Sequence, residues 1–271
     1  MKLLRNGSDF AAYRLGRLTV VALRDGYVDM APSRLRRDDD RPFGPDLPEP
    51  VKAALVEGQL RLSVNAFLIA GNGRHILIDT GAANAWDPSM GRLPAALAEA
   101  GVAPADIDTV AFTHTHLDHV SGLVAAEGTD MFPNLEHLYV PLNELPLFHR
   151  KERLARFRER AEGFDGGFAL SDNVTAIAAH GHEVGHSAFE VSDAGETLLV
   201  WGDIVHVPSI QFAQPELTWE LDADQAQARA SRETLLRRAT ENGTFVAGAH
   251  LDFPGVGRVA TSGNGYRFIP L

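Results

Sequence analysis

Cysteine is absent from this chain of 271 residues. Its absence excludes disulfide frameworks, thiolate metal sites and cysteine nucleophiles, so any metal must be bound by histidine and carboxylate side chains. Long apolar runs are missing as well, since no stretch approaches the roughly 18 apolar residues of a membrane-spanning helix. Residues 1–12 hold only scattered apolar side chains and do not resemble a secretory signal, which favours a cytoplasmic protein.

Basic residues are the minority among the charged side chains. The 25 lysines and arginines stand against 36 aspartates and glutamates, which gives a formal net charge of -11. Such a chain repels nucleic acids and anionic membranes at long range, so we expect neither as a partner. A small-molecule substrate, neutral or apolar, fits this charge balance better.

The chain contains no internal linker, repeat or low-complexity tract. With 45% hydrophobic residues it can bury a sizeable core, and we expect a single domain over residues 1–271. Residues 31–50 contain five prolines, several arginines and an acidic triplet. This composition is typical of a loop, which we expect to cover a site or to join two subunits.

Predicted strands and helices alternate along the sequence. Apolar and β-branched runs predict strands at 18–23, 63–69, 75–78, 109–112, 138–140, 174–178, 188–191, 197–200 and 244–247. Helices are predicted at 50–55, 93–100, 144–160 and 223–238. Turn chemistry predicts that Asp25-Gly26 ends the first strand and that Gly71-Asn72-Gly73 closes a hairpin. The pattern indicates a mixed sheet with helices outside it.

Four side chains that can bind metal lie within six residues, directly after a predicted strand: His114, His116, Asp118 and His119. A lone histidine is more often a surface or core residue than a ligand, but this density on one loop is rare by chance. In a tight loop, one pair of these side chains can face one ion while the other pair faces a neighbouring ion. The run therefore predicts a metal site.

A tetrahedral zinc site with two imidazoles is incomplete, because it needs a third protein ligand and an open position for water. Three candidates follow the ends of later apolar runs: His182, Asp203 and His250. Gly181, which precedes the first of them, permits a sharp turn. All the candidate loops thus stand at the end of a predicted buried strand.

The pattern His-x-His-x-Asp-His, with a later His, Asp and His, resembles the signature of the metallo-β-lactamase superfamily. Asp79 in Ile78-Asp79-Thr80-Gly81 also stands at the family's upstream position, and the matching elements span residues 63–255. The resemblance implies an α/β fold, namely a four-layered αβ/βα sandwich of two mixed β-sheets flanked by helices. It further implies that Asp79 supports the site without binding metal.

The resemblance also implies a set of ligands for two divalent cations: His114, His116, Asp118, His119, His182, Asp203 and His250. The first cation would take His114, His116 and His182, and the second would take the others with Asp203 as a bridge. Zinc is the favoured metal, while iron, manganese and cobalt stay open as alternatives.

Two such cations would activate a bridging hydroxide, which would attack a small ester, lactone or phosphotriester. Asp118 is a candidate for proton transfer to the leaving group. The chain is most similar to the methyl parathion hydrolase and lactonase-like branch of the superfamily, which also suggests a homodimer. However, His206 stands where many N-acyl-homoserine-lactone lactonases have a tyrosine that contacts substrate. This departure favours aryl esters, other lactones and phosphotriesters as substrates. His206 would then either contact the substrate or pack against neighbouring side chains.

A largely apolar pocket is expected around the metals. We take Trp86, Phe132, Leu251 and Phe253 as candidates for its walls, with ordinary core packing as the alternative. His186, four residues after His182, is a candidate hydrogen-bonding partner within the site. The remaining histidines are not expected to be ligands: His75, His137, His149 and His180.

Two rival functions stay open. A glyoxalase II-like thioester hydrolase would favour a basic patch near the C-terminus, where four arginines lie on a predicted helix in the pattern of a solvated face: Arg229, Arg232, Arg237 and Arg238. A non-catalytic metal-binding module on the same scaffold would be expected to have lost ligands, and none is missing. Hydrolysis is therefore the preferred interpretation.

Overall fold

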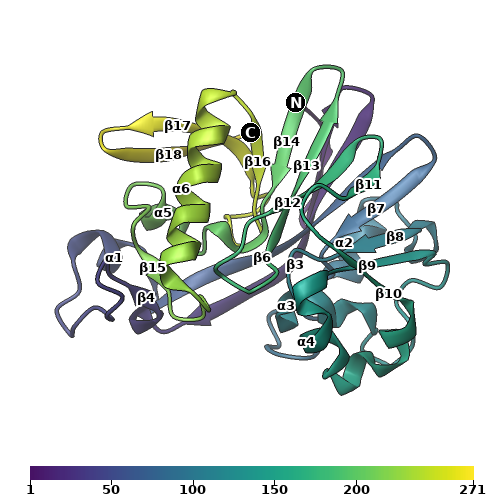
Figure 1. The fold of residues 1–271 in the computed structure, drawn as a ribbon, viewed down its shortest axis with the longest axis horizontal. Coiled ribbons are helices and arrows are strands. Elements are labelled where there is room, and N and C mark those ends of the chain that lie inside the picture. The colour runs from purple at the N-terminus through teal and green to yellow at the C-terminus, as the bar shows by residue number, and fades with distance from the viewer.

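Two mixed β-sheets form the body of the protein in the computed structural model, which describes residues 1–271 (Figure 1). The first sheet contains, in spatial order, β1 (Lys2–Asn6), β2 (Phe10–Leu15), β3 (Leu18–Met30), β6 (Gln59–Gly71), β7 (Arg74–Ile78), β8 (Thr109–Ala111), β9 (His137–Pro141) and β10 (Ala161–Phe164), with β5 (Leu55–Val56) paired to β6. The second contains β11 (Ala169–Ser171), β12 (Val174–Ala178), β13 (Ser187–Asp193), β14 (Glu196–Val200), β16 (Phe245–Ala247), β17 (Val256–Ser262) and β18 (Gly265–Pro270).

The core has three layers of side chains because each sheet is covered on both faces. Between the sheets, residues such as Phe67 from β6 and Phe189 from β13 share one buried apolar cluster. Outside the first sheet lies α2 (Leu93–Glu99), and outside the second lies α6 (Gln225–Glu241), which buries Leu235 against it. This arrangement is the predicted four-layered sandwich of the metallo-β-lactamase fold. No helix combines the length and the apolar character that crossing a bilayer requires.

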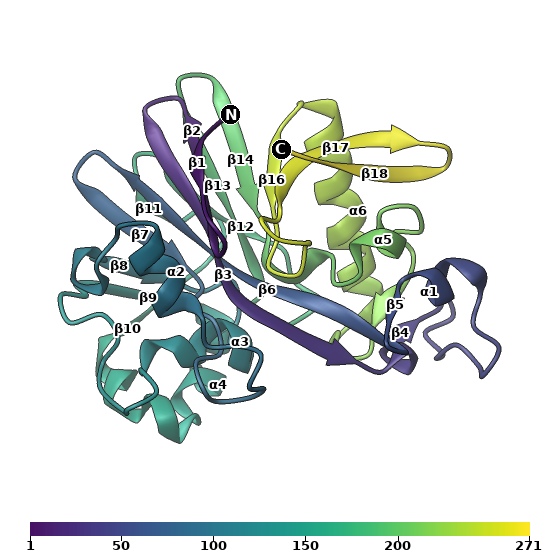
Figure 2. The same ribbon diagram turned by 180° about the vertical axis from the view of Figure 1, so that it is seen from behind.

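Strands β3 and β6 are much longer than predicted and pass beyond the sandwich (Figure 2). The turn predicted at Asp25-Gly26 is wrong, because the strand continues through a β-bulge there. Gly26 fits the bulge since its φ is 151° and an added Cβ would lie 2.1 Å from the Ser89 carbonyl oxygen. The bulge thus separates the part of β3 in the sandwich from a projecting part, here called the arm (residues 26–30 and 59–64).

The arm packs on the segment predicted to be a loop. Short elements there include β4 (Leu35–Arg36) and α1 (Glu49–Ala53), so residues 31–50 are not irregular throughout. β4 pairs with β15 (Thr218–Trp219), and α5 (Pro208–Gln211) lies nearby in the same apolar cluster. This cluster attaches the N-terminal segment to the C-terminal half of the chain.

The single helix predicted at 144–160 is also wrong. The structure has a short 3-10 turn, then α4 (Leu145–His149), then a 3-10 helix over Glu152–Arg160. Lys151, between the last two, has extended backbone angles of φ -80° and ψ 106° and therefore interrupts the helix. The predicted hairpin of β6 and β7 and the predicted helices at 93–100 and 223–238 are confirmed within a few residues.

The carboxyl ends of several strands meet at one edge of the sandwich. β7 and β8 run parallel in the first sheet, and β14 and β16 run parallel in the second. β12 has the same direction as β14, since both are antiparallel to β13. Each of these strands is followed by a loop that carries predicted site residues, so the topology brings those loops together.

Candidate metal centre

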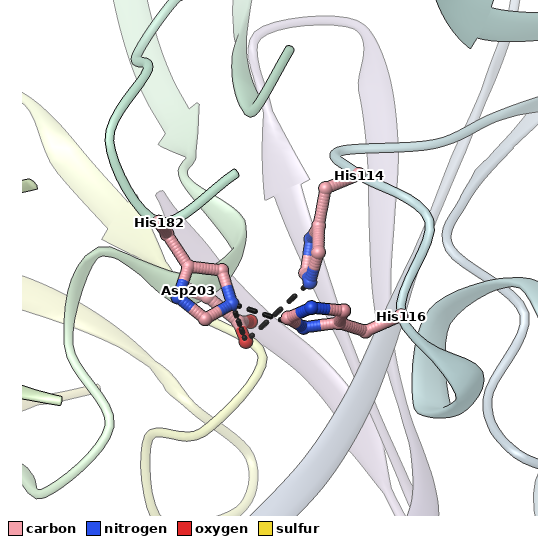
Figure 3. A group of neighbouring side chains, drawn as sticks. All are labelled: His114, His116, His182 and Asp203. Atoms are coloured by element: carbon pink, nitrogen blue, oxygen red, sulfur yellow. Dashed lines mark hydrogen bonds and ion pairs between the residues drawn. The ribbon is translucent and has the colours of Figure 1, made fainter. Parts of the chain in front are cut away.

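The seven predicted metal ligands form two neighbouring groups in the structure. The first ligand group is His114, His116, His182 and Asp203, and the second is Asp118, His119 and His250. Within each group the potential ligand atoms all lie within 4.8 Å of one another. Figure 3 shows the three imidazoles of the first group converging on the Asp203 carboxylate. All seven side chains are buried except His116, which is half-buried.

Asp203 lies between the two ligand groups. Its Oδ2 is 3.3 Å from His182 Nε2 and 3.7 Å from His114 Nε2 in the first group. The same oxygen is 3.0 Å from His250 Nε2, while Oδ1 is 3.2 Å from His119 Nε2. Gly202, whose φ is 56°, provides the turn that places this carboxylate after β14. One carboxylate is therefore within reach of both groups.

The outer nitrogen of each of the five ligand imidazoles lies next to an oxygen atom, which for His114 is the Thr113 hydroxyl at 3.1 Å. His119 Nδ1 is 2.9 Å from an Asp79 oxygen, and His182 Nδ1 is 2.8 Å from an Asp222 oxygen. The other two contacts are 2.8 Å from His116 Nε2 to Glu183 Oε1 and 2.7 Å from His250 Nδ1 to the Ser63 carbonyl. A proton on each outer nitrogen leaves the inner nitrogen with a lone pair, as in ligand histidines of metal proteins.

Several inner atoms of the two ligand groups lack a suitable hydrogen-bond partner in the protein. His182 Nε2 and His116 Nδ1 are 3.1 Å apart, so two lone pairs face each other when both outer nitrogens carry protons. His114 Nε2, His119 Nε2 and Asp203 Oδ1 are buried without any hydrogen-bond partner. Burying such atoms unsatisfied is costly, and a divalent cation would satisfy them. The donor set therefore fits cations bound by imidazole and carboxylate.

Electrostatics in the absence of a cation agree with this conclusion. Burial lowers the pKa of His182, but hydrogen bonds to Asp203 and Asp222 outweigh it and raise the pKa to about 10. For Asp203, burial raises the pKa, but the surrounding histidines hold it well below its ordinary value. The carboxylate is thus ionised, and the cluster holds protons that a bound cation would displace.

Asp79 and His186 hold the ligand loops in place through hydrogen bonds. Asp79 accepts hydrogen bonds from the Thr113 N–H at 2.8 Å and from the Thr113 hydroxyl at 2.9 Å, in addition to contacting His119. His186 Nε2 accepts the backbone N–H of Asp203 at 3.1 Å, and its Nδ1 donates to the Ala179 carbonyl at 2.9 Å. His186 thus supports Asp203 and does not contact a ligand ring through a hydrogen bond.

Three carboxylates of the site were missed in the sequence: Glu144, Glu183 and Asp222. Buried Glu144 accepts hydrogen bonds from Thr115 N at 2.8 Å and from Gly185 N at 3.2 Å, and so joins two ligand loops. Glu183 follows a predicted ligand directly, and this adjacency was the one available signal. Glu144 and Asp222 stand in no recognisable motif.

A cavity of about 300 Å³ opens above the ligands. Trp86 lines it as predicted, but the other three proposed wall residues do not: Phe132, Leu251 and Phe253 pack in the apolar core. Its apolar wall comes instead largely from the arm and from β15 with the loop that follows it: Val28, Met30, Leu62, Trp86, Leu117, Trp219 and Leu221. The arm could not be located from sequence because the strands that form it were predicted too short.

His206 also lines the cavity. Its Nε2 is 3.4 Å from Asp203 Oδ2, and its ring stacks on Trp219 with 5.1 Å between centroids and on His250 with 5.2 Å. Neither ring nitrogen has a hydrogen-bond partner. Burial lowers the pKa of His206 to about 4, so the ring is neutral at neutral pH.

The arginines of α6 do not form a free basic patch. The interpretation as a solvated face is wrong for Arg232, which is buried and donates to the carbonyl oxygens of Ile204 at 2.6 Å and Leu217 at 2.7 Å. Arg229 contacts Asp40, and Arg238 is paired with a glutamate of β13. Nothing on this helix resembles a binding site for an anionic thiol carrier.

Comparisons with known proteins agree with the geometry. A sequence profile of the metallo-beta-lactamase superfamily matches residues 60–250. The solved hydrolase AbOPH of the beta lactamase superfamily is 28% identical, with a TM-score of 0.86 and coverage of 98% of this chain and 99% of that one. AidC, a dizinc quorum-quenching lactonase solved with a homoserine product, is 23% identical, with a TM-score of 0.84 and coverage of 97% and 98%. A probable metal-dependent hydrolase from Staphylococcus aureus is 19% identical, with a TM-score of 0.76 and coverage of 96% and 99%. No curated protein matches the chain.

Proposed function

The chain belongs to the metallo-beta-lactamase superfamily, and from this premise we propose that it is a dinuclear metal-dependent hydrolase of small esters, lactones or phosphotriesters. The observation that carries the proposal is the placement of Asp203 between two groups of buried imidazoles, each with one ring nitrogen that has no hydrogen-bond partner, His114 Nε2 in the first and His119 Nε2 in the second. A single-ion site would leave one of these groups unsatisfied. The same geometry, with mostly imidazole ligands, favours zinc.

The first ligand group would hold one cation and the second would hold the other, with Asp203 shared between them. When bound, two divalent cations lower the pKa of shared water toward ~7 and so supply a nucleophile at neutral pH. Asp79, Asp222 and Glu183 keep the ligand rings in place through their outer nitrogens. No serine nucleophile is required.

Two side chains of the cavity are suited to act on the substrate. Asp118 is buried with an oxygen 3.6 Å from His119 Nε2 and lines the cavity, so it can carry a proton to the leaving group. His206 is neutral and hydrogen-bond free, so one of its ring nitrogens can donate to a substrate oxygen.

The substrate class is supported by the cavity and by the relatives. A volume of about 300 Å³ with a mainly apolar wall suits a small organic ester rather than a polymer. AbOPH is described as a hydrolase and AidC as a lactonase, and both match this chain over nearly its whole length. A metal-binding module without catalysis would have no need of such a cavity.

Metal content and turnover together test the proposal. We expect about two metals per chain by elemental analysis, and hydrolysis of at least one of an aryl ester, a γ-lactone, an acyl-homoserine lactone, a phosphotriester and a thioester. Asp203→Ala should lose metal and activity, whereas Asp46→Ala, at an exposed aspartate, should lose neither. Less than one metal per chain after reconstitution, with no turnover of any of the five, would refute a dinuclear hydrolase.

A further inference from the structure

Lys151 is the only lysine or arginine that lines the cavity. The chain has only three lysines, and the other two, Lys2 and Lys52, are exposed. Lys151 interrupts the helical segment between α4 and Glu152–Arg160, and its backbone N–H donates to the Phe148 carbonyl at 3.1 Å. The break in the helix therefore places a cation at the wall of an otherwise largely apolar cavity.

The ammonium group of Lys151 has no partner in the protein, neither a hydrogen-bond acceptor nor an ion pair. The carboxylates of Glu144 and Glu183 act on this ammonium electrostatically, but each forms its hydrogen bonds with other groups. Glu144 accepts from Thr115 and Gly185, and Glu183 holds His116. Burial lowers the pKa of Lys151, while these two glutamates oppose the change. A half-buried ammonium of this kind is stabilised when an anionic oxygen binds it.

The rest of the wall restricts what that anion is attached to. Seven of the fourteen lining residues are hydrophobic, and the other side chains apart from Lys151 are the metal ligands and His206. Asp118, Lys151 and His206 all line this cavity of about 300 Å³, so a molecule that fills it contacts Lys151 as well. The matching ligand is therefore a small apolar molecule with one anionic group, although the net charge of -11 by itself favours neutral substrates.

We propose that Lys151 is a specificity-determining residue that binds a carboxylate carried by the substrate away from its scissile bond. The inference rests on the proposed hydrolase function and deepens it. It predicts that a small ester with a remote carboxylate is preferred over a neutral ester of the same length.

A matched pair of esters tests this preference. The 4-nitrophenyl half-ester of adipic acid carries the carboxylate, and 4-nitrophenyl hexanoate is its neutral counterpart. We expect Lys151→Met to reduce the ratio of kcat/KM for the charged ester to that for the neutral ester by about 10-fold to 100-fold, mainly through KM. Lys151→Arg should keep most of the ratio, and Lys151→Glu should invert it. Lys52→Met, at an exposed lysine of α1, is the control and should keep the wild-type ratio.

Direct binding separates this inference from the proposed function. Calorimetric titration with adipic acid monoanilide and with hexananilide compares charged and neutral ligands without turnover. Tighter binding of the charged anilide that is lost in Lys151→Met supports the anion site even if no ester is hydrolysed. Equal loss of activity on both esters in Lys151→Met, with no ligand preference in the wild type, would show that Lys151 only supports the ligand loops and would overturn the inference.

Discussion

Asp222 illustrates how a residue that binds no metal can control metal affinity. One oxygen holds His182 Nδ1 at 2.8 Å, and the other accepts the Trp219 N–H at 2.8 Å. We expect Asp222→Ala to weaken zinc binding by about 10-fold to 100-fold, because the imidazole of His182 loses its fixed orientation. Competition with a chromophoric chelator measures this. Asp172→Ala, at an exposed aspartate, is the control, and equal affinities in the two variants would contradict the role assigned to Asp222.

Asp193 determines part of the response to acid. Hydrogen bonds from the guanidinium and backbone N–H of Arg17 lower the pKa of Asp193 to about 2. A carboxyl whose pKa is lower in the folded state stabilises the protein above about pH 4 and loses that contribution as the pH falls toward 2. Asp193→Asn should therefore flatten the loss of stability between these values, measured by urea unfolding at several pH values. An unchanged slope relative to the wild type would argue against this pair.

At the residue scale, sequence could predict the ligands but not their partners. The ligands cluster in a motif because one loop must present several donors, and this density is visible in a single sequence. Glu144 and Asp222 act from 29 and 40 residues away from the groups that they hold, so only the fold reveals their roles. The position of Lys151 in the cavity wall could not be predicted for another reason, since an uninterrupted helix was predicted around it.

At the scale of elements, the bulge in β3 is the sharpest departure from the prediction. Gly26→Ala should destabilise the protein by about 2–4 kcal/mol, because its Cβ would lie 2.1 Å from a backbone oxygen with no room to move. Gly73→Ala is the matched control, since its φ is also positive but nothing lies within 4 Å, and it should cost only about 1 kcal/mol. Denaturant unfolding gives both values, and similar losses would show that the backbone angle alone matters.

The same strand explains why elements were harder to delimit than to detect. Asp25-Gly26 has the composition of a turn, but the backbone N–H groups of Ala82 and Leu93 bind the Asp25 carboxylate and keep it inside the sheet region. Local turn preference was therefore overridden by contacts from distant loops. Strands with continuous apolar runs, such as β14, had no competing signal and were predicted closely.

For the whole molecule, metal removal should lower stability and not only activity. The ligands come from loops of both sheets, so bound cations connect them. At free zinc 100 times its Kd, binding adds roughly 2.7 kcal/mol to the free energy of unfolding. We expect chelator treatment to lower Tm by several degrees and zinc to restore it, as followed by thermal unfolding. Asp203→Ala should show little change with either treatment, and a wild-type Tm insensitive to chelator would speak against a cation shared between the sheets.

The order of layers was predictable because the sequence patterns of strands and helices are repeated along the chain. Alternating strands and helices indicate a mixed sheet with outer helices, and the resemblance of the ligand motif supplied the sandwich. The cavity was not predictable, since its wall combines β3, β6 and β15 from opposite ends of the sequence. Only the fold brings Met30 and Trp219 together in the wall of one cavity.

The bulge at Gly26 also divides β3 into two parts with different surroundings. On one side of it, residues up to Leu23 are clamped in the sandwich core, and on the other, Val28 and Met30 project to the cavity wall with Leu62. The arm therefore supplies three apolar residues of the cavity wall and none of the seven candidate metal ligands. Exchanging side chains of the arm can thus reshape the cavity without replacing a single candidate ligand.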